Sequence, residues 1–418
     1  MHSIVHGKVH AFAPCVVTAL FMIGLYFPSS VSGEQSAGLL VREMVLLFVL
    51  FGTLAFSCGI GRFRLQLNGC LILLVIVACT FLSPFGSYAI GAIYIYVLLV
   101  FLYNLNLQTI QSTSHMRTAF GAANIINLVL GIGIILQSDA VTNFLQDHYT
   151  YFYPELLATM FALRKPVLTF GSHSVAAFYT FLFFWMNLKT FEREKRWVYL
   201  FLAVTQTVFS LFLFSFTSFF FFACELVMLI SLLLQRGRQS TIRFAFVLVV
   251  VVISAVGMLP RMSIYDPEWN YHLVDYATSF LTSTENGPVG RYSSGGDLAA
   301  DLKYLGENPL RPVGLSKPNS LFFMDSGPVE YLLRGSLPLL LLIYGGLYIF
   351  LCDNMTARRD ALALFIVIVL FETGFPILLH LRTLYLLPFF VVYMNGLRIT
   401  PKAESLYASV GRAAIGAS

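Results

Sequence analysis

Two polar stretches of the chain carry the residue types that could do chemistry. The longer stretch runs from Arg261 to Pro328 and contains Gly290-Arg291-Tyr292. The planar guanidinium of Arg291 could grip a phosphate, and the carboxylate of Asp325 could accept a proton. Arg291 could instead pair with a loop carboxylate, and Asp325 could cap the following helix. The spacing of these residues alone does not decide between the two interpretations.

The shorter polar stretch, about residues 138–170, ends in a second group of candidate residues. Arg164 and Lys165 stand just before a helix that we expect to start near Ser172. Cations close to a helix N-terminus can form an anion site, and His173 follows as a candidate substrate-binding residue. The alternative is a pair of solvated loop cations, a capping serine and a histidine that is only a polar residue at a helix start.

The elements that must position these residues are apolar helices. The chain has 418 residues, of which 58% are hydrophobic and 11% are charged, whereas soluble domains have about 25% charged residues. Apolar runs of about 20 residues, long enough to cross a bilayer, recur along the chain. We predict an all-α polytopic membrane protein, residues 1–418 as a single integral-membrane domain with about twelve transmembrane helices. The expected spans are 11–29, 38–57, 68–86, 88–105, 118–137, 171–189, 197–214, 217–235, 243–259, 329–351, 360–379 and 381–397.

Two local features refine this outline. The apolar stretch Trp197–Gln235 is too long for one ordinary span, so we predict a tight turn near Phe214–Ser218. The polar region 261–328, between spans nine and ten, is punctuated by Gly and Pro. It is expected to be a large, mostly helical loop of short helices joined by turns, with one helix over Leu298–Gly306.

The distribution of basic residues predicts the orientation. With the N-terminus inside, the inner segments hold 16 of the 26 Lys and Arg residues, which is a positive-inside pattern. Those residues are Lys8, Arg62, Arg64, Arg117, Lys189, Arg193, Lys195, Arg196, Arg236, Arg238, Arg243, Arg358, Arg359, Arg398, Lys402 and Arg412. Both termini are then inside, and the stretches 138–170 and 261–328 are outside. We interpret the net charge of +5 as a topology signal and expect no nucleic-acid partner.

The cysteines give no sign of a metal or a disulfide framework. All six lie in or beside apolar runs, and none shows the spacing of a zinc site. We therefore expect no metal, no disulfides and no cofactor.

The order of four short motifs suggests a function. Gly290-Arg291 is followed by Glu307-Asn308-Pro309-Leu310 with Gly314, then by Asp325-Ser326, and finally by Gly335 in the next helix. This order resembles the bacterial O-antigen polymerase and ligase superfamily, that is, Wzy-type polymerases and WaaL-type ligases. The resemblance covers the span count, the loop position and about 50 motif residues; elsewhere the chain matches only as apolar helix.

The resemblance implies a membrane glycosyltransferase with a GT-C-like fold in the bacterial inner membrane. Such an enzyme moves a growing glycan from undecaprenyl diphosphate to a sugar hydroxyl at the periplasmic face, without a bound nucleotide sugar. Its partners would be the lipid-linked oligosaccharide, membrane lipid and a chain-length regulator (a polysaccharide co-polymerase). The product could be O-antigen, capsule or exopolysaccharide.

The family's functional residues carry over in part. Arg291 matches the loop arginine expected to bind the diphosphate, and Arg164 matches a basic position before the helix that begins the second half. Asp325 falls where ligases carry a motif histidine, which favours a polymerase and leaves the identity of the base open. Relatives also place a Ser-Arg near residues 214–219, where this chain has no arginine. Arg311 and Arg382 are therefore candidates for the missing phosphate ligand.

Two carboxylates inside apolar spans are further candidates. Buried carboxylates in lipid usually face the bundle interior and often have a role, and Glu225 and Glu372 lie in spans eight and eleven. Glu372 is close in sequence to His380 and Arg382, so this trio could line the active cavity.

Three other functions compete with the polymerase. The first is the related ligase, which joins a finished glycan to an acceptor. The second is a flippase or transporter of lipid-linked sugars, although no paired interruption of helices is evident. The third is a structural or sensory membrane protein. A large outer loop with a cluster of motifs favours an enzyme.

Overall fold

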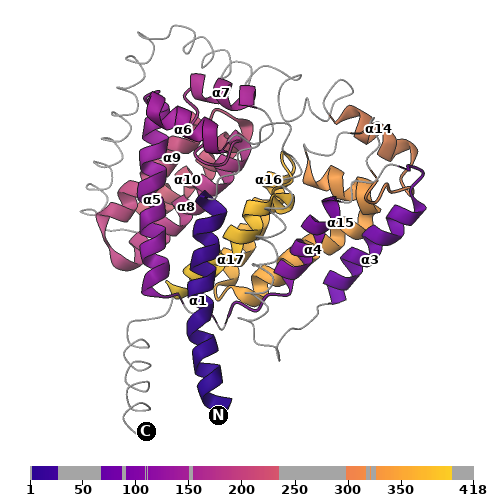
Figure 1. Cartoon of the computed structure of the whole chain (residues 1–418), viewed down its shortest axis with the longest axis horizontal. Helices are drawn as coiled ribbons and strands as arrows, with labels where there is room; N and C mark the ends of the chain where they lie inside the picture. Colours follow the sequence, from indigo (N-terminus) through magenta and orange to yellow (C-terminus); the bar gives the residue numbers. More distant parts are fainter. Residues whose placement is uncertain are drawn as a thin grey trace.

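The computed structural model describes residues 2–26, 67–86, 91–108, 110, 112–149, 154–234, 298–316, 321 and 326–397. Within these residues the regular structure is helical, with thirteen α-helices and one short 3-10 helix, η1 (Figure 1). The helices are α1 His2–Tyr26, α3 Leu67–Leu82, α4 Gly91–Tyr103, α5 Ser114–Ile135, α6 Asp139–Tyr149, α7 Pro154–Ala162, α8 His173–Glu194, α9 Trp197–Phe212, α10 Phe216–Leu234, α14 Ala299–Glu307, α15 Gly327–Asn354, α16 Arg358–Glu372, η1 Ile377–Leu379 and α17 Leu381–Gly396.

The helices fall where hydropathy predicts them. Ten of the twelve expected spans coincide with α1, α3, α4, α5, α8, α9, α10, α15, α16 and α17. The other two, 38–57 and 243–259, lie outside the described residues. In the described part of the chain, α5 and α15 are long and apolar enough to cross a membrane, each with a mean hydropathy of 1.9. The all-α class is confirmed, and the number of twelve spans stays a prediction.

The two predicted local features are also present. α9 ends at Phe212 and α10 begins at Phe216, so the long apolar stretch is divided by a turn at the expected place. α14 covers Ala299–Glu307, which confirms the short helix expected there. The shorter polar stretch contains two helices of its own, α6 and α7, which the sequence did not suggest.

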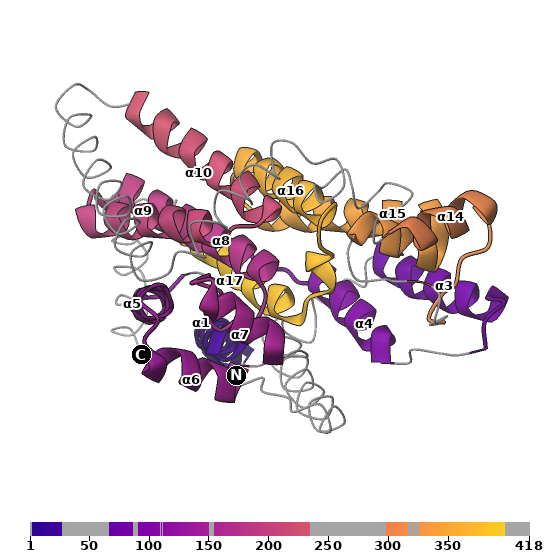
Figure 2. The ribbon, with the colours of Figure 1, turned by 90° about the horizontal axis from the view of Figure 1, so that it is seen from above.

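The helices gather into two groups joined by α16 and α17 (Figure 1 and Figure 2). One group holds α1 and α5 to α10, and the other holds α3, α4, α14 and α15. α17 contacts α1, α4 and α8, while α16 packs against α15. Between them, α16 and α17 therefore connect the two groups.

α8 is a central helix of its group. Its residues from Val175 to Leu188 are buried on every side, because α9 and α10 pack along it. A helix that is apolar all round is stable only when it is enclosed in this way. Aromatic rings make much of the contact: Phe181 stacks on Phe221 of α10 with centroids 4.8 Å apart, and Phe221 stacks on Phe371 of α16 at 5.2 Å.

Polar contacts tie the helix termini together in two separate layers. We call one layer the Thr169 end, because Thr169 Oγ1 donates to the Leu25 carbonyl at 2.8 Å, close to the end of α1. Tyr149 donates to the Tyr26 carbonyl at 2.7 Å in the same layer. The Thr169 end brings together the last turns of α1, α5 and α9 and the first turns of α8, α10 and α17.

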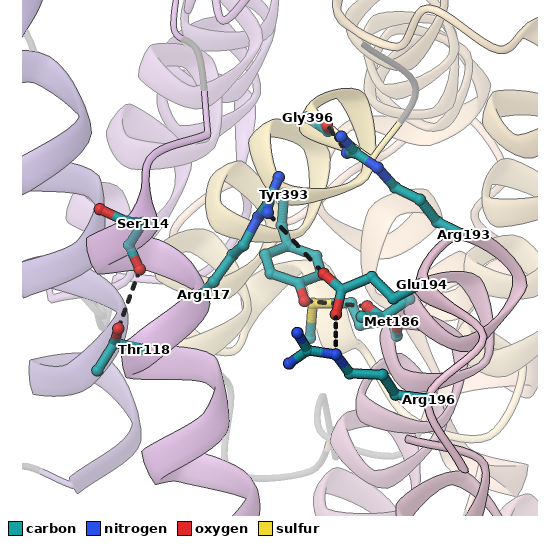
Figure 3. Close-up of polar contacts among 10 residues, drawn as sticks. Ser114, Arg117, Thr118, Met186, Arg193, Glu194, Arg196, Tyr393 and Gly396 are labelled. Carbon is teal, nitrogen blue, oxygen red and sulfur yellow. Dashed lines mark hydrogen bonds and ion pairs between the residues drawn. The ribbon is translucent and has the colours of Figure 1, made fainter. Parts of the chain in front are cut away.

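The opposite layer is the Asn354 end. Asn354 Nδ2 donates to the Leu105 carbonyl at 3.0 Å, and Asn395 Nδ2 donates to the Asn354 carbonyl at 2.7 Å. These bonds join the last turns of α4, α15 and α17. Arg193 of α8 reaches the Gly396 carbonyl at the end of α17 (Figure 3).

Candidate functional site

The two cations predicted before α8 are held by backbone carbonyls. Arg164 is 7% exposed, and its Nη1 donates to the Ile135 carbonyl at the end of α5, 3.3 Å away. Lys165 Nζ donates to the Phe214 carbonyl after α9 at 3.4 Å, and burial lowers the pKa of this lysine. The C-terminal carbonyls of a helix carry its partial negative charge, so cations are favoured there. The segment after α7 thus joins the ends of α5 and α9.

The start of α8 lies in the same layer. α8 begins at His173 with Ser172 at the cap position, but the Ser172 side chain makes no cap hydrogen bond. Ser172 therefore takes the predicted cap position through its backbone: its carbonyl accepts a hydrogen bond from the Ala176 amide at 2.9 Å. Ser174 accepts a hydrogen bond from Thr217 Oγ1 at 3.3 Å, which links the start of α8 to the start of α10.

Arg382 enters this layer from α17. It is 5% exposed, donates to the Thr169 carbonyl and places its guanidinium carbon 5.5 Å from the centre of the Phe170 ring. A cation over an aromatic face is stabilised by the ring quadrupole. Arg382 therefore fixes the segment that carries Arg164 and Lys165 against α17.

His380 lies beside Arg382 and contacts α8 through the hydroxyl of Tyr179. The Tyr179 hydroxyl is 3.4 Å from His380 Nδ1 and 3.3 Å from Thr383 Oγ1. Burial, aided by the positive charge of Arg382, lowers the pKa of His380 to about 3. The imidazole is therefore neutral at pH 7, with one ring nitrogen that can donate a hydrogen bond and one that can accept. We refer to Arg164, Lys165, Thr169, His380 and Arg382 as the Thr169 cluster.

Glu372 connects this cluster to the start of α15. Its Oε1 accepts hydrogen bonds from the Tyr331 hydroxyl at 3.0 Å and from the Leu378 amide at 2.8 Å. Its Oε2 is buried without a hydrogen-bond partner among the described residues. A Cβ placed on Gly327 would lie 2.8 Å from Oε2, so the glycine permits this close approach. Glu372 thus lies against the residue that follows the Asp325-Ser326 motif.

A second polar region surrounds a break in α15. Gly335 and Ser336 have non-helical backbone angles, with φ of +55° at Ser336. The segment after α14 supplies the missing hydrogen bonds: the Val313 amide donates to the Leu333 carbonyl at 2.7 Å, and the Gly314 amide donates to the Arg334 carbonyl at 3.1 Å. Ser336 Oγ in turn donates to the Pro309 carbonyl at 3.3 Å.

A buried ion pair stabilises the same region. Arg334 Nε lies 2.5 Å from Glu330 Oε1, with both side chains about 5% exposed, and Arg334 Nη1 donates to the Gly314 carbonyl at 2.8 Å. Gly314 has φ of +54°, and a Cβ there would lie 2.3 Å from the Thr80 amide of α3. This pair was not predicted from the sequence. A signal was present, because two opposite charges four residues apart inside an apolar run face one another on a helix.

Four of the eight predicted site residues come together, His173 begins α8 in the same layer, and Arg311 lies elsewhere. Arg164, Lys165, His380 and Arg382 belong to the Thr169 cluster. Arg311 is exposed after α14, and α14 lies apart from α7, in the group that holds α3 and α15 (Figure 1 and Figure 2). The two residues predicted to be catalytic, Arg291 and Asp325, lie outside the described residues.

Glu225 has a local partner within its own helix pair. It is fully buried in α10, and its Oε1 accepts a hydrogen bond from Ser210 of α9 at 3.0 Å. This bond links α10 to α9, so Glu225 has a structural contact within that helix pair.

Comparison with known proteins adds no further assignment. No family model matches the chain, and no curated protein or solved structure is significantly similar to it. Fold and site define a helical bundle with membrane-length helices and a layer of buried cations at one end.

Proposed function

We propose that this chain is an integral membrane polymerase of polysaccharide repeat units. It would transfer a growing glycan from undecaprenyl diphosphate to a sugar hydroxyl at the periplasmic face of the bacterial inner membrane. One observation carries the proposal: the described parts of the motif pack on each other. The Pro309 carbonyl accepts a hydrogen bond from the Ser336 side chain. The Gly314 amide donates to the Arg334 carbonyl, and the Gly314 carbonyl accepts from the Arg334 side chain. Both contacts lie next to Gly335.

The arrangement of the helix ends supports the proposed orientation. The Thr169 end gathers turns that were all predicted to lie outside. The Asn354 end gathers turns predicted to lie inside, and it carries Arg117, Arg193 and Arg196 (Figure 3). Basic residues concentrate on the cytoplasmic side of membrane proteins, so this layer is the expected cytoplasmic one.

The chemistry of glycan transfer assigns roles to the polar groups. The bond between the sugar's anomeric carbon and the diphosphate oxygen breaks, and the acceptor hydroxyl forms the new bond as it loses its proton. Cations offset the charge that develops on the diphosphate, which is the role proposed for Arg291. A carboxylate can take the proton, and Asp325 has the required chemistry.

The buried cations have a different proposed role. Arg164 and Arg382 each donate to a main-chain carbonyl, so they position the segment around Thr169. That segment is predicted to form part of the outer face, next to the site where the carrier diphosphate would bind. We propose that Lys165 and His173 contact the substrate from this segment and that Arg311 contacts it from the other side.

Substitution of Arg291 tests the proposal. Arg291→Ala should abolish chain growth and leave single lipid-linked repeats exposed at the outer face, measured by glycan gel and by labelling of intact cells. Lys303→Ala is the matched control, because Lys303 is an exposed cation on α14 in the same polar stretch. Normal long polymer from Arg291→Ala cells would exclude the diphosphate clamp.

Substitution of the carboxylates separates the candidates for the base. Asp325→Asn keeps the shape of the side chain and removes its basicity. A loss of at least about a hundredfold in polymerisation rate is expected if Asp325 takes the proton. Near-full activity in Asp325→Asn would exclude it as an obligatory base.

The break in α15 favours a second candidate function. Transporters often use discontinuous helices to bind their substrates, and α15 is discontinuous at Gly335 and Ser336. A flippase defect traps lipid-linked repeats at the inner face, whereas a polymerase defect leaves them at the outer face. The labelling of Arg291→Ala cells therefore distinguishes the two functions directly.

A further inference from the structure

A pocket at the Asn354 end lies between the C-terminal halves of α8 and α10. Its volume is 560 Å³, within the range of roughly 300–1,000 Å³ that is typical of small-molecule sites. The lining residues are Leu188, Lys189, Glu192, Lys195, Val227, Met228, Ser231 and Leu232. The α8 wall contributes three charged side chains, whereas the α10 wall is mostly apolar. A pocket with one charged and one apolar wall matches an amphiphile.

The charged wall has one surplus positive charge. Lys189 Nζ lies 2.9 Å from Glu192 Oε2, so these two residues neutralise each other. Lys195 ends α8 in the left-handed conformation, with φ of +59°, and its side chain makes no ion pair among the described residues. The lining therefore carries a net charge of +1 at pH 7.

The apolar wall continues onto the surface of α10. Val227 in the pocket is 66% exposed, and Ile230 one turn further along is 52% exposed. These side chains present a strip of apolar surface beside the charged wall. Basic pockets between transmembrane helices on the cytoplasmic side are a recurrent binding site for phospholipid headgroups.

We propose that this pocket binds an anionic phospholipid with a single negative charge, of the phosphatidylglycerol type. The phosphodiester lies between Lys189 and Lys195, and the headgroup hydroxyls donate to Glu192. The acyl chains run along Val227 and Met228. A zwitterionic lipid would leave the surplus charge of Lys195 uncompensated, so it should bind more weakly. The site rests on the membrane placement of the bundle and does not depend on the polymerase activity.

Native mass spectrometry of the purified full chain tests the proposal. Phosphatidylglycerol is titrated onto the protein in detergent, with phosphatidylcholine and phosphatidylethanolamine as reference lipids. Tight retention of one phosphatidylglycerol is expected in the wild type. The double variant Lys189→Gln/Lys195→Gln should bind it about tenfold more weakly, because it removes both cations that face the phosphate. Equal binding of phosphatidylglycerol by this variant and the wild type would overturn the proposal.

A control at the same end separates the pocket from general surface charge. Arg117→Gln/Arg196→Gln also removes two positive charges, but from side chains outside the pocket. Binding in this variant should match the wild type. An equal loss in both double variants would show that phosphatidylglycerol responds only to the field of the surface, which contradicts a defined site.

Two further measurements address the shape of the pocket and the source of the phosphate. Met228→Trp fills the apolar wall without changing charge and should reduce retention of phosphatidylglycerol; if this variant fails to fold, the lysine variants still decide. Inorganic phosphate should not displace the lipid, and displacement would overturn the lipid assignment. None of these binding measurements uses glycan. If the lipid site is disproved, the polymerase proposal still stands; if the polymerase proposal is disproved, the lipid site still stands.

Discussion

Cations occupy opposite environments at the two ends of the bundle. At the Thr169 end, Arg164 and Arg382 are 7% and 5% exposed and donate to main-chain carbonyls. At the Asn354 end, the side chains of Arg117 and Arg196 are 35% and 73% exposed and lie 3.8 and 3.7 Å from Glu194 (Figure 3). The same residue type is therefore used in two different ways.

Buried and exposed cations in such a sequence therefore have to be interpreted differently. An exposed ion pair contributes about 0–1 kcal/mol, so Arg117 and Arg196 indicate orientation more than they stabilise the fold. A buried guanidinium loses its hydration and needs hydrogen-bond partners in return. Each cation at the Thr169 end meets this need with a carbonyl, which makes it part of the backbone architecture. Five predictions follow from this contrast between buried and exposed cations.

The largest effect is expected at the buried ion pair of α15. Arg334→Met leaves the Glu330 carboxylate buried without its partner, so the free energy of unfolding should fall by about 3–5 kcal/mol. Thermal or SDS-induced unfolding of the purified protein measures it. The double variant Glu330→Leu/Arg334→Met should recover much of the loss, because no lone charge remains. If the free energy of unfolding of Arg334→Met lies within about 1 kcal/mol of wild type, the proposed difference between buried and exposed cations is wrong.

A smaller loss is expected at Arg382. Arg382→Met removes the donor to the Thr169 carbonyl and the cation over Phe170, so unfolding should become easier by about 2–3 kcal/mol. Arg196→Met is the matched control at the exposed end and should stay within about 0.5 kcal/mol of wild type. Similar losses in the two variants would contradict the proposed difference in role.

A third prediction concerns Gly314, whose carbonyl accepts a hydrogen bond from Arg334 and whose backbone lies close to α3. Gly314→Ala forces a Cβ into the Thr80 backbone at a positive φ and should destabilise the protein by about 2 kcal/mol. Gly306→Ala is the control, because nothing lies within 4 Å of its Cβ position in α14. There alanine should be neutral or stabilising by up to about 1 kcal/mol. Equal effects at the two glycines would argue against a tight contact with α3.

The pH dependence of stability reports on His380. In the folded protein this imidazole takes up a proton only near pH 3, whereas in the unfolded chain it does so near pH 6.5. The unfolded state therefore binds more protons between these values, and the free energy of unfolding should fall as the pH is lowered through this window. His380→Gln should remove part of that slope, measured as the unfolding midpoint at pH 7 and pH 4.5. An unchanged slope would place His380 in a more hydrated environment.

The smallest effect is expected at the exposed end. Glu194→Gln removes the partner of both Arg117 and Arg196, yet the free energy of unfolding should change by less than about 1 kcal/mol. The change should shrink further at high ionic strength, because salt screens exposed charges. If Glu194→Gln lowers the free energy of unfolding as much as Arg334→Met does, solvent exposure does not explain the difference between the two ends.

Much of the fold could be predicted from the sequence because hydropathy is a local property. Runs of about 20 apolar residues marked ten described helices, and the turn at Phe214–Ser218 followed from length alone. The helices α6 and α7 were missed because they lie in a polar stretch with no long apolar run. The break in α15 was also missed, since it depends on donors from the segment around Val313 and Gly314.

The site was predictable in its residue types but not in its contacts. Arg164 and Arg382 were both candidates, yet nothing in their spacing showed that Arg382 meets the Thr169 carbonyl from 213 residues away. Arg311 was chosen by charge alone, and the structure places it in the exposed segment that follows α14. Long-range hydrogen bonds have no periodic signature, so only the assembled helices could show which cations lie together.

The break in α15 has a consequence for the biogenesis of the protein. The carbonyls of Leu333 and Arg334 receive their hydrogen bonds from the amides of Val313 and Gly314. A carbonyl without a partner in the bilayer core costs several kcal/mol. The ribosome makes the donors first, and on the proposed topology they are exported before α15 leaves the translocon. The first turns of α15 can therefore settle in the lipid only after the preceding segment has crossed the membrane and docked.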